Sequence, residues 1–146
     1  MNQDISQYSN IGYTGVGYLV VRVTTASAAL PLEDALVTVF GDRPDFSSVI
    51  AQLKTGADGL TPKIALSAPP RTLSEVPGNG ETAYATYNIT VNERGFYPLR
   101  IQHVPIFDGI TSVQPANLIP LLENGYPDSF DPFTETVVEG ETLGNL

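Results

Sequence analysis

The sequence predicts an all-β protein, a single seven-stranded Greek-key β-sandwich with extended N- and C-terminal arms. Short segments alternate apolar and polar residues, and none has helical periodicity beyond one turn. The 12 prolines and 13 glycines lie between these segments, as turns in a β fold require. The 146 residues suffice for one core. We expect an N-terminal arm over residues 1–16, the sandwich over 17–122 and an acidic C-terminal arm over 123–146.

The strand predictions follow from period-two alternation between turn signals. In order, the expected strands span residues 17–25, 34–40, 49–55, 62–68, 83–91, 96–104 and 110–122. The apolar positions expected to face the core in the first two are Leu19, Val21, Val23, Ala35, Val37 and Val39. The Pro- and Gly-punctuated stretch 69–82 is expected to be the longest surface loop.

Charge and composition narrow the function classes. The net charge of −9 repels phosphate backbones and disfavours nucleic-acid binding. Residues 123–146 carry six of the acids and no base. The chain has no cysteine, and its first residues do not resemble a signal peptide. No apolar run is long enough for membrane insertion. We expect synthesis in the cytoplasm and a final place in an extracellular, spore-surface or phage-particle assembly.

Several short motifs resemble the carboxypeptidase regulatory-like domain of the transthyretin-like superfamily, a group of Ig-like β-sandwiches. They are PLEDALVTVF, TGADG and VNERGFYP, and the resemblance covers about residues 18–122. The residues that carry it are Ala35, Thr55, Gly59, Gly95, Phe96 and Tyr97. Residues 83–122 are similar to a subgroup found in spore-forming anaerobic bacteria. The 69–82 insert and both arms depart from the pattern, and such a fold implies no particular function.

No set of residues predicts bond chemistry, a cofactor site or a metal site. His103 is the only histidine and is expected to be an ordinary strand residue, since a lone imidazole lacks a second histidine for a metal or an acid–base pair. The superfamily's hydroxyisourate hydrolase uses several histidines, which this chain lacks. Arg22 stands where an intramolecular isopeptide bond would need lysine. The acids of 41–45 and 128–131 do not match a calcium loop.

The aromatic residues near two strands leave two interpretations open: a platform for carbohydrate stacking, or core and edge packing. They are Tyr84, Tyr87, Phe96, Tyr97 and Phe107.

The C-terminal arm contains TETVVEGETL, which alternates like a strand that lacks a sheet. It could be a disordered acidic tail, the remnant of a LysM peptidoglycan-binding module, or a strand that pairs with the sheet edge of a neighbouring molecule. On the last interpretation, the assembly residues are Tyr8, Ile11, Tyr13, Val16, Phe130, Phe133, Val137, Val138 and Leu143.

These observations predict a structural protein and no enzyme. The expected function is that of a subunit that self-assembles or docks through its arms into a bacterial extracellular filament, spore-associated layer or phage particle. Its partners would be copies of itself or other structural proteins. The alternative is an accessory module that binds cell-wall glycan or peptide, with peptidoglycan as its partner.

Overall fold

The computed structural model describes residues 14–42, 49–71, 84–121 and 136–140. These residues form nine strands and no α-helix, so the all-β prediction is confirmed. The strands are β1 (Gly15–Thr25), β2 (Leu30–Pro31), β3 (Leu36–Gly41), β4 (Val49–Lys54), β5 (Ile64–Ala68), β6 (Tyr84–Asn92), β7 (Leu99–Phe107), β8 (Thr111–Asn117) and β9 (Thr136–Glu139).

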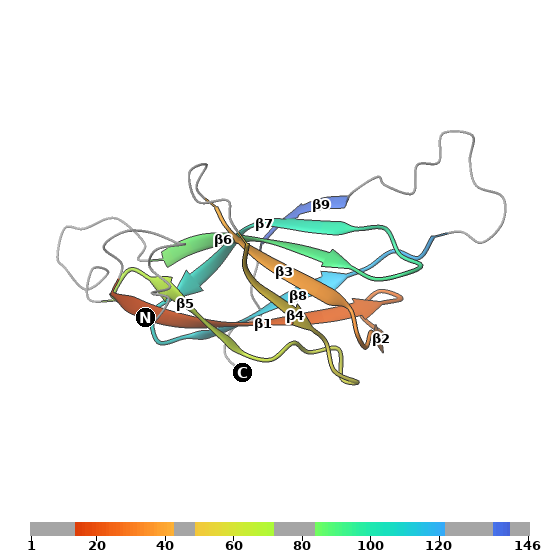
Figure 1. Cartoon of the computed structure of the whole chain (residues 1–146), viewed down its shortest axis with the longest axis horizontal. Helices are drawn as coiled ribbons and strands as arrows, with labels where there is room; N and C mark the ends of the chain where they lie inside the picture. Colours follow the sequence, from red (N-terminus) through yellow and green to blue (C-terminus); the bar gives the residue numbers. More distant parts are fainter. Residues whose placement is uncertain (1–13, 43–48, 72–83, 122–135, 141–146) are drawn as a thin grey trace.

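Two sheets pack face to face (Figure 1). In the first sheet, β1 pairs antiparallel with β5 and β2 and parallel with β8. The second sheet has the order β4-β3-β6-β7-β9. All seven predicted strands are present, and β2 and β9 are additional, so the seven-strand Greek-key detail is not confirmed. No helix in the described part of the chain is long and apolar enough to cross a membrane.

The core forms where the alternating apolar faces of the sheets meet. All six residues predicted to face inward on the first two strands are fully buried, at 0% exposure. Alternate residues of β6 and β7 complete the core from the second sheet, including Tyr87 and Ile101. Burial of each valine, leucine or isoleucine side chain contributes about 1.5–3 kcal/mol, so these faces fix the relative position of the sheets.

Thr55 and Gly59 of the TGADG turn stabilise the loops that connect the strands. The buried Thr55 hydroxyl accepts a hydrogen bond from the N–H of Ala35 at 3.0 Å and donates one to the carbonyl of Leu32 at 2.6 Å. Gly59 has φ +79°, and a Cβ there would lie 2.6 Å from the carbonyl oxygen of Val23. Glycine is therefore required at this position by both backbone conformation and space.

The C-terminal arm forms a strand, as one of the three interpretations of the sequence predicted, and this strand pairs with the chain's own sheet. β9 pairs in parallel with β7 of the same chain, with Leu99 opposite Thr136 and Gln102 opposite Glu139. Figure 1 shows β9 alongside β7 at the edge of the second sheet. Pairing within one chain costs only loop closure, which grows slowly with loop length, whereas pairing with a second molecule costs its translational freedom. The edge of β7 is thus covered by the chain's own segment.

Candidate functional site

A β-bulge places His103 on the outer face of the second sheet. The register of β6 and β7 shifts between Tyr87 and Ile89, so that Gln102 and His103 both stand opposite Asn88. His103 has φ +58°, a left-handed conformation that costs a non-glycine residue free energy. The Oδ1 atom of Asn88 accepts a hydrogen bond from the His103 N–H at 3.1 Å. The bulge therefore turns the imidazole away from the regular ladder and out over the sheet.

β9 brings a carboxylate to one side of the imidazole. Glu139 lies opposite Gln102 in the β7–β9 register, and its Oε1 and Oε2 atoms are 2.9 and 3.3 Å from Nδ1 of His103. The next residue, Gly140, donates from its N–H to the carbonyl of Gln102. A Cβ on Gly140 would lie 2.5 Å from the Cα of Val104, so only glycine lets β9 approach β7 this closely.

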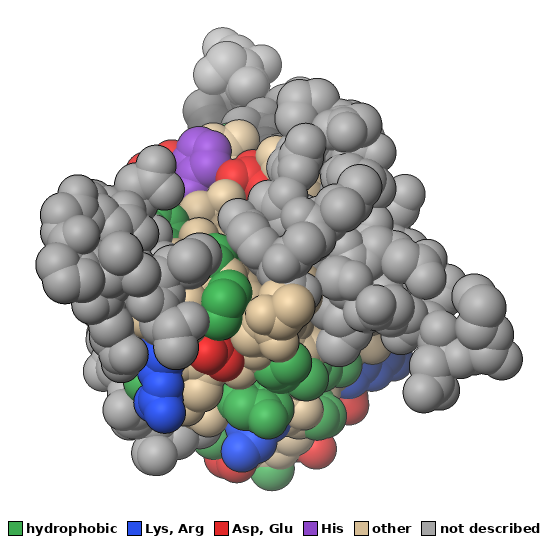
Figure 2. All heavy atoms as spheres, turned by 90° about the vertical axis from the view of Figure 1, so that its left-hand side faces the viewer, with side chains coloured by type: hydrophobic (Ala, Val, Ile, Leu, Met, Phe, Trp, Pro, Cys, Tyr) green, Lys and Arg blue, Asp and Glu red, His purple; other side chains and the backbone are tan. Residues whose placement is uncertain are grey.

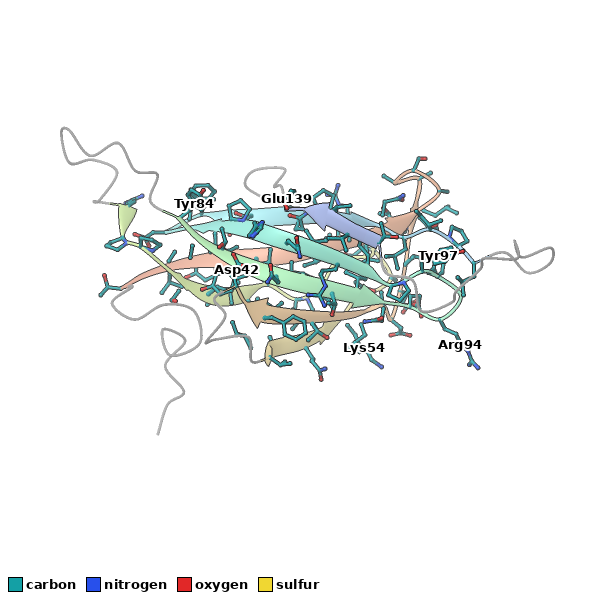
Figure 3. All side chains as sticks on the ribbon, turned by 90° about the horizontal axis from the view of Figure 1, so that it is seen from above. Asp42, Lys54, Tyr84, Arg94, Tyr97 and Glu139 are labelled. Atoms are coloured by element: carbon teal, nitrogen blue, oxygen red, sulfur yellow. The ribbon has the colours of Figure 1, made fainter. Side chains whose placement is uncertain are left out.

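A second carboxylate stands on the other side of the ring. Asp42 follows the last residue of β3, and its Oδ2 atom is 3.8 Å from Nε2 of His103. The same oxygen accepts a hydrogen bond of 2.5 Å from the Thr86 hydroxyl of β6. Figure 2 shows the histidine, in purple, at the surface with acidic side chains, in red, near it. Figure 3 looks onto this face and labels Asp42 and Glu139 on it.

These contacts change the acid–base behaviour of His103. The hydrogen bond to Glu139 is the largest cause that raises the pKa of His103 above its ordinary value of 6.5, and the negative charges of Asp42 and Glu139 add to it. Desolvation lowers the pKa and only partly offsets this, because half of the side chain is exposed. The two carboxylates therefore shift the protonation equilibrium of His103 toward the imidazolium form.

A hollow of 240 Å³ lies on the same sheet and shares Asn88 with the His103 bulge. It is lined by Phe40 and Gly41 of β3, Asn88 of β6 and Arg100 of β7. Asn88 lines this hollow, and its side-chain oxygen accepts the hydrogen bond from the backbone N–H of His103. The arrangement thus combines a proton donor, two carboxylates and a small space of mixed apolar and cationic character.

The described residues contain no group of three or more His, Asp or Glu side chains that could hold a metal ion. Glu139 and Asp42 approach opposite nitrogens of one ring, so the three side chains do not converge on a common point. We therefore treat His103, Asp42 and Glu139 as acid–base groups.

None of the three sequence-predicted assembly residues within the described part of the chain belongs to this site. Val137 and Val138 lie in β9, and Val16 lies in β1; all three are exposed hydrophobic residues. The other six lie outside the described residues: Tyr8, Ile11, Tyr13, Phe130, Phe133 and Leu143.

The aromatic residues divide between the two interpretations that the sequence left open. Tyr87 is fully buried and Phe96 packs against the core, as the packing interpretation requires. Tyr84 is 40% exposed, and its ring centroid lies 5.5 Å from that of Phe107. Phe107 is half-buried, so Tyr84 is the exposed member of this pair and the five aromatic residues do not form one exposed platform.

His103 lies in strand β7, as predicted, but its position at a β-bulge and its two carboxylate neighbours were not foreseen. One signal was available: the buried residues of β7 change phase between Ile101 and Val104, which indicates an extra residue in the strand. Nothing in the sequence pairs this bulge with Asp42 or Glu139.

Several solved structures that match part of this chain are enzymes. Catechol 1,2-dioxygenase from Acinetobacter sp. ADP1 matches with TM-score 0.48 and 14% identity, over 90% of this chain and 61% of that one. 3-Chlorocatechol 1,2-dioxygenase from Rhodococcus opacus 1CP gives 0.45 and 13%, over 77% and 63%. (S)-Allantoin synthase gives 0.43 and 14%, over 90% and 44%. The chain therefore spans less than two thirds of the length of these proteins. No family model and no curated protein matches the sequence.

These comparisons contradict two of the sequence-based predictions. The matching structures are enzymes, so the expectation of a non-enzymatic structural subunit, with its cell-wall-binding alternative, is corrected, as is the expectation of no enzyme. The pairing of β9 with β7 also removes the free C-terminal strand on which the assembly prediction depended. At 13–14% identity the likeness concerns the fold alone, and no activity is transferred from it to this chain.

Proposed function

We propose that this protein catalyses proton transfer on small carbonyl compounds, with His103 as the general acid and Asp42 as the general base. One observation carries the proposal. The Nε2 atom of His103 and the Oδ2 atom of Asp42 lie 3.8 Å apart on an open sheet face, while Glu139 engages the other ring nitrogen. An acid and a base side by side can act on neighbouring atoms of one substrate molecule.

Glu139 is a positioning residue for the acid. By accepting a hydrogen bond from the Nδ1–H group of His103, it fixes the orientation of the ring. It also raises the imidazole pKa, which favours the imidazolium form, in which Nε2 carries a proton as well. The 3.8 Å separation from Asp42 is longer than a hydrogen bond, so this proton is not consumed by the neighbouring carboxylate. A substrate oxygen that enters beside Nε2 can accept it.

Asp42 supplies the base on the same side of the substrate. The Thr86 hydroxyl holds one of its oxygens, and only 17% of its side chain is exposed. In the proposed step, Asp42 takes a proton from the carbon next to the carbonyl while His103 gives its Nε2 proton to the carbonyl oxygen. The products are the enol, a protonated Asp42 and a neutral His103. Proton exchange with water restores both groups.

The adjacent hollow supports a small substrate with an anionic end. Its volume of 240 Å³ is below the roughly 300–1,000 Å³ of pockets for drug-sized ligands, Phe40 provides an apolar wall and Arg100 provides positive charge. A guanidinium attracts carboxylates through paired N–H donors. We therefore place 2-oxo acids ahead of neutral ketones as substrates.

Deuterium exchange tests the proposal without knowledge of the final product. Pyruvate, dihydroxyacetone and acetone are incubated with the protein in D₂O, and loss of the protons next to the carbonyl is followed by NMR. We expect exchange above the buffer rate, fastest for pyruvate, and a loss of about a hundredfold or more in His103→Gln and in Asp42→Asn. Glu33→Gln removes a charge outside the site and should keep the rate.

Exchange at the buffer rate for all three compounds contradicts the proposal. Exchange that survives His103→Gln contradicts the role assigned to the imidazole. Circular dichroism of each variant shows that the fold is retained, so a loss of exchange can be assigned to the altered side chain.

Three sequence-based expectations stay predictions beside this proposal. They are the transthyretin-like family resemblance, the absence of nucleic-acid partners inferred from the net charge of −9, and the final compartment. The predicted partners, which are copies of this chain, other structural proteins or peptidoglycan, likewise stay predictions.

A further inference from the structure

A second hollow, separate from the His103 site, lies where the edge of the second sheet meets the first. It has a volume of 530 Å³ and is formed by β1, the end of β4 and the loop that leads to β5. Its lining residues are Val20, Lys54, Thr55, Gly56, Asp58, Leu60, Thr61, Pro62 and Lys63. Figure 3 shows Lys54 on the β4 side of the second sheet, whereas Glu139 lies toward the β9 side.

Both lysines of the chain line this hollow. The sequence contains 16 acids against seven lysines and arginines, and Lys54 and Lys63 are its only lysines. Neither ammonium forms an ion pair within the described residues. The Lys63 Nζ atom lies 5.2 Å from the ring centroid of Tyr18, a cation–π contact that restrains one of the two. In so acidic a chain, two ammonium groups that face one concave surface and form no ion pair with the described residues indicate an anion site.

The walls of the hollow are fixed by hydrogen bonds before any ligand arrives. The Gly56 N–H donates to the carbonyl of Leu60, and the Thr61 hydroxyl accepts from the N–H of Val21, each at 2.9 Å. Val20 is 3% exposed and forms an apolar wall with Leu60 and Pro62. A preformed surface avoids the free-energy cost of ordering a loop on binding.

Asp58 limits the charge that the hollow accepts. Its Oδ1 atom accepts a hydrogen bond from the Leu60 N–H at 3.0 Å, so the carboxylate is held by its own loop. Two ammonium groups and one carboxylate leave one net positive charge beside an apolar wall. This balance suits a singly charged anion with an apolar body better than a compact multivalent anion.

We infer that this hollow binds a small organic carboxylate, with Lys54 and Lys63 on the carboxylate and the Val20–Leu60 wall on the apolar body. This site binds a ligand and takes no part in the proton transfer proposed at His103. Affinity comes from both parts, so removal of either the charge or the apolar body from the ligand should weaken binding.

Titration of the full chain with matched probes tests the inference. Benzoate, hexanoate, inorganic phosphate and neutral benzamide are added to ¹⁵N-labelled protein, and amide shifts near Val20 and Lys63 are followed. We expect saturable binding of benzoate and hexanoate that weakens as salt rises. Phosphate should bind more weakly because it lacks an apolar body, and benzamide should not bind because it lacks charge.

Substitution of the lysines assigns the site. Lys54→Gln and Lys63→Gln should each weaken benzoate binding about tenfold, and the double variant should abolish it. Arg94→Gln removes the same charge from a turn outside the hollow and should leave the affinity unchanged, as should His103→Gln. Equal binding of benzoate and benzamide, no saturable binding of either carboxylate, or an Arg94 effect as large as that of the lysines would overturn the inference.

Discussion

Replacement of His103 by glycine and by alanine isolates the backbone strain at the bulge. Both variants lose the imidazole and its contacts with Glu139 and Asp42, so the loss of these contacts cancels in the comparison. The φ of +58° costs an alanine about 1–2 kcal/mol, whereas glycine adopts it freely. The glycine variant gains this difference and loses about 0.5–1 kcal/mol through the greater entropy of its unfolded chain. We expect His103→Gly to be more stable than His103→Ala by about 0.5–1 kcal/mol.

Urea unfolding of the two variants measures this difference, which corresponds to a midpoint shift of about 0.2–1 M at m-values of about 1–3 kcal/mol/M. Gln102 is the matched control because it precedes His103 on β7 and is not among the residues with positive φ. There the order should reverse, with the alanine variant more stable by about 0.5–1 kcal/mol. An alanine variant at position 103 that equals or exceeds the glycine variant would refute the assignment of strain to this residue.

Three further predictions follow from named contacts. Gly140→Ala places a methyl group against the backbone of Val104 and should detach β9, seen as faster amide exchange in that strand with global stability nearly retained. Thr55→Ala leaves the N–H of Ala35 without its side-chain partner and should lower the free energy of unfolding by about 1–3 kcal/mol, whereas Thr55→Ser should retain most of it. Two backbone N–H groups lower the pKa of Asp108, so the stabilisation by this carboxylate is fully present above pH 3.8, its ordinary pKa. The stabilisation should fade as pH falls through the lowered pKa, and acid unfolding of the wild type compared with Asp108→Asn measures this loss.

The strands were predictable because each carries its own evidence. Leu19, Val21 and Val23 alternate with outward residues, and the core face follows directly from that period. The turn residues Thr55 and Gly59 were recognisable for the same reason, since their requirements are local. Local signals thus fixed which residues enter the sheets and which face is buried.

The site was not predictable because it depends on contacts between distant segments. His103 and Glu139 are 36 positions apart, and their contact exists only because β9 pairs with β7. The alternation of the C-terminal arm indicated a strand, but it contained no information on which sheet edge the strand would join. An edge in the same chain and an edge in a neighbouring molecule offer the same main-chain hydrogen bonds, so the sequence pattern could not separate them.

The pKa of the single imidazole tests the central claim most directly. NMR titration of the wild-type protein reports His103 without overlap, because the chain has one histidine. A raised pKa means that the His103 contribution to stability is full below 6.5 and is lost as pH rises through the folded-state value. We predict a wild-type pKa above 6.5 that falls toward that value in Glu139→Gln and stays high in Glu33→Gln. A wild-type pKa at or below 6.5, or one that Glu139→Gln leaves unchanged, would show that this histidine is not held between two carboxylates.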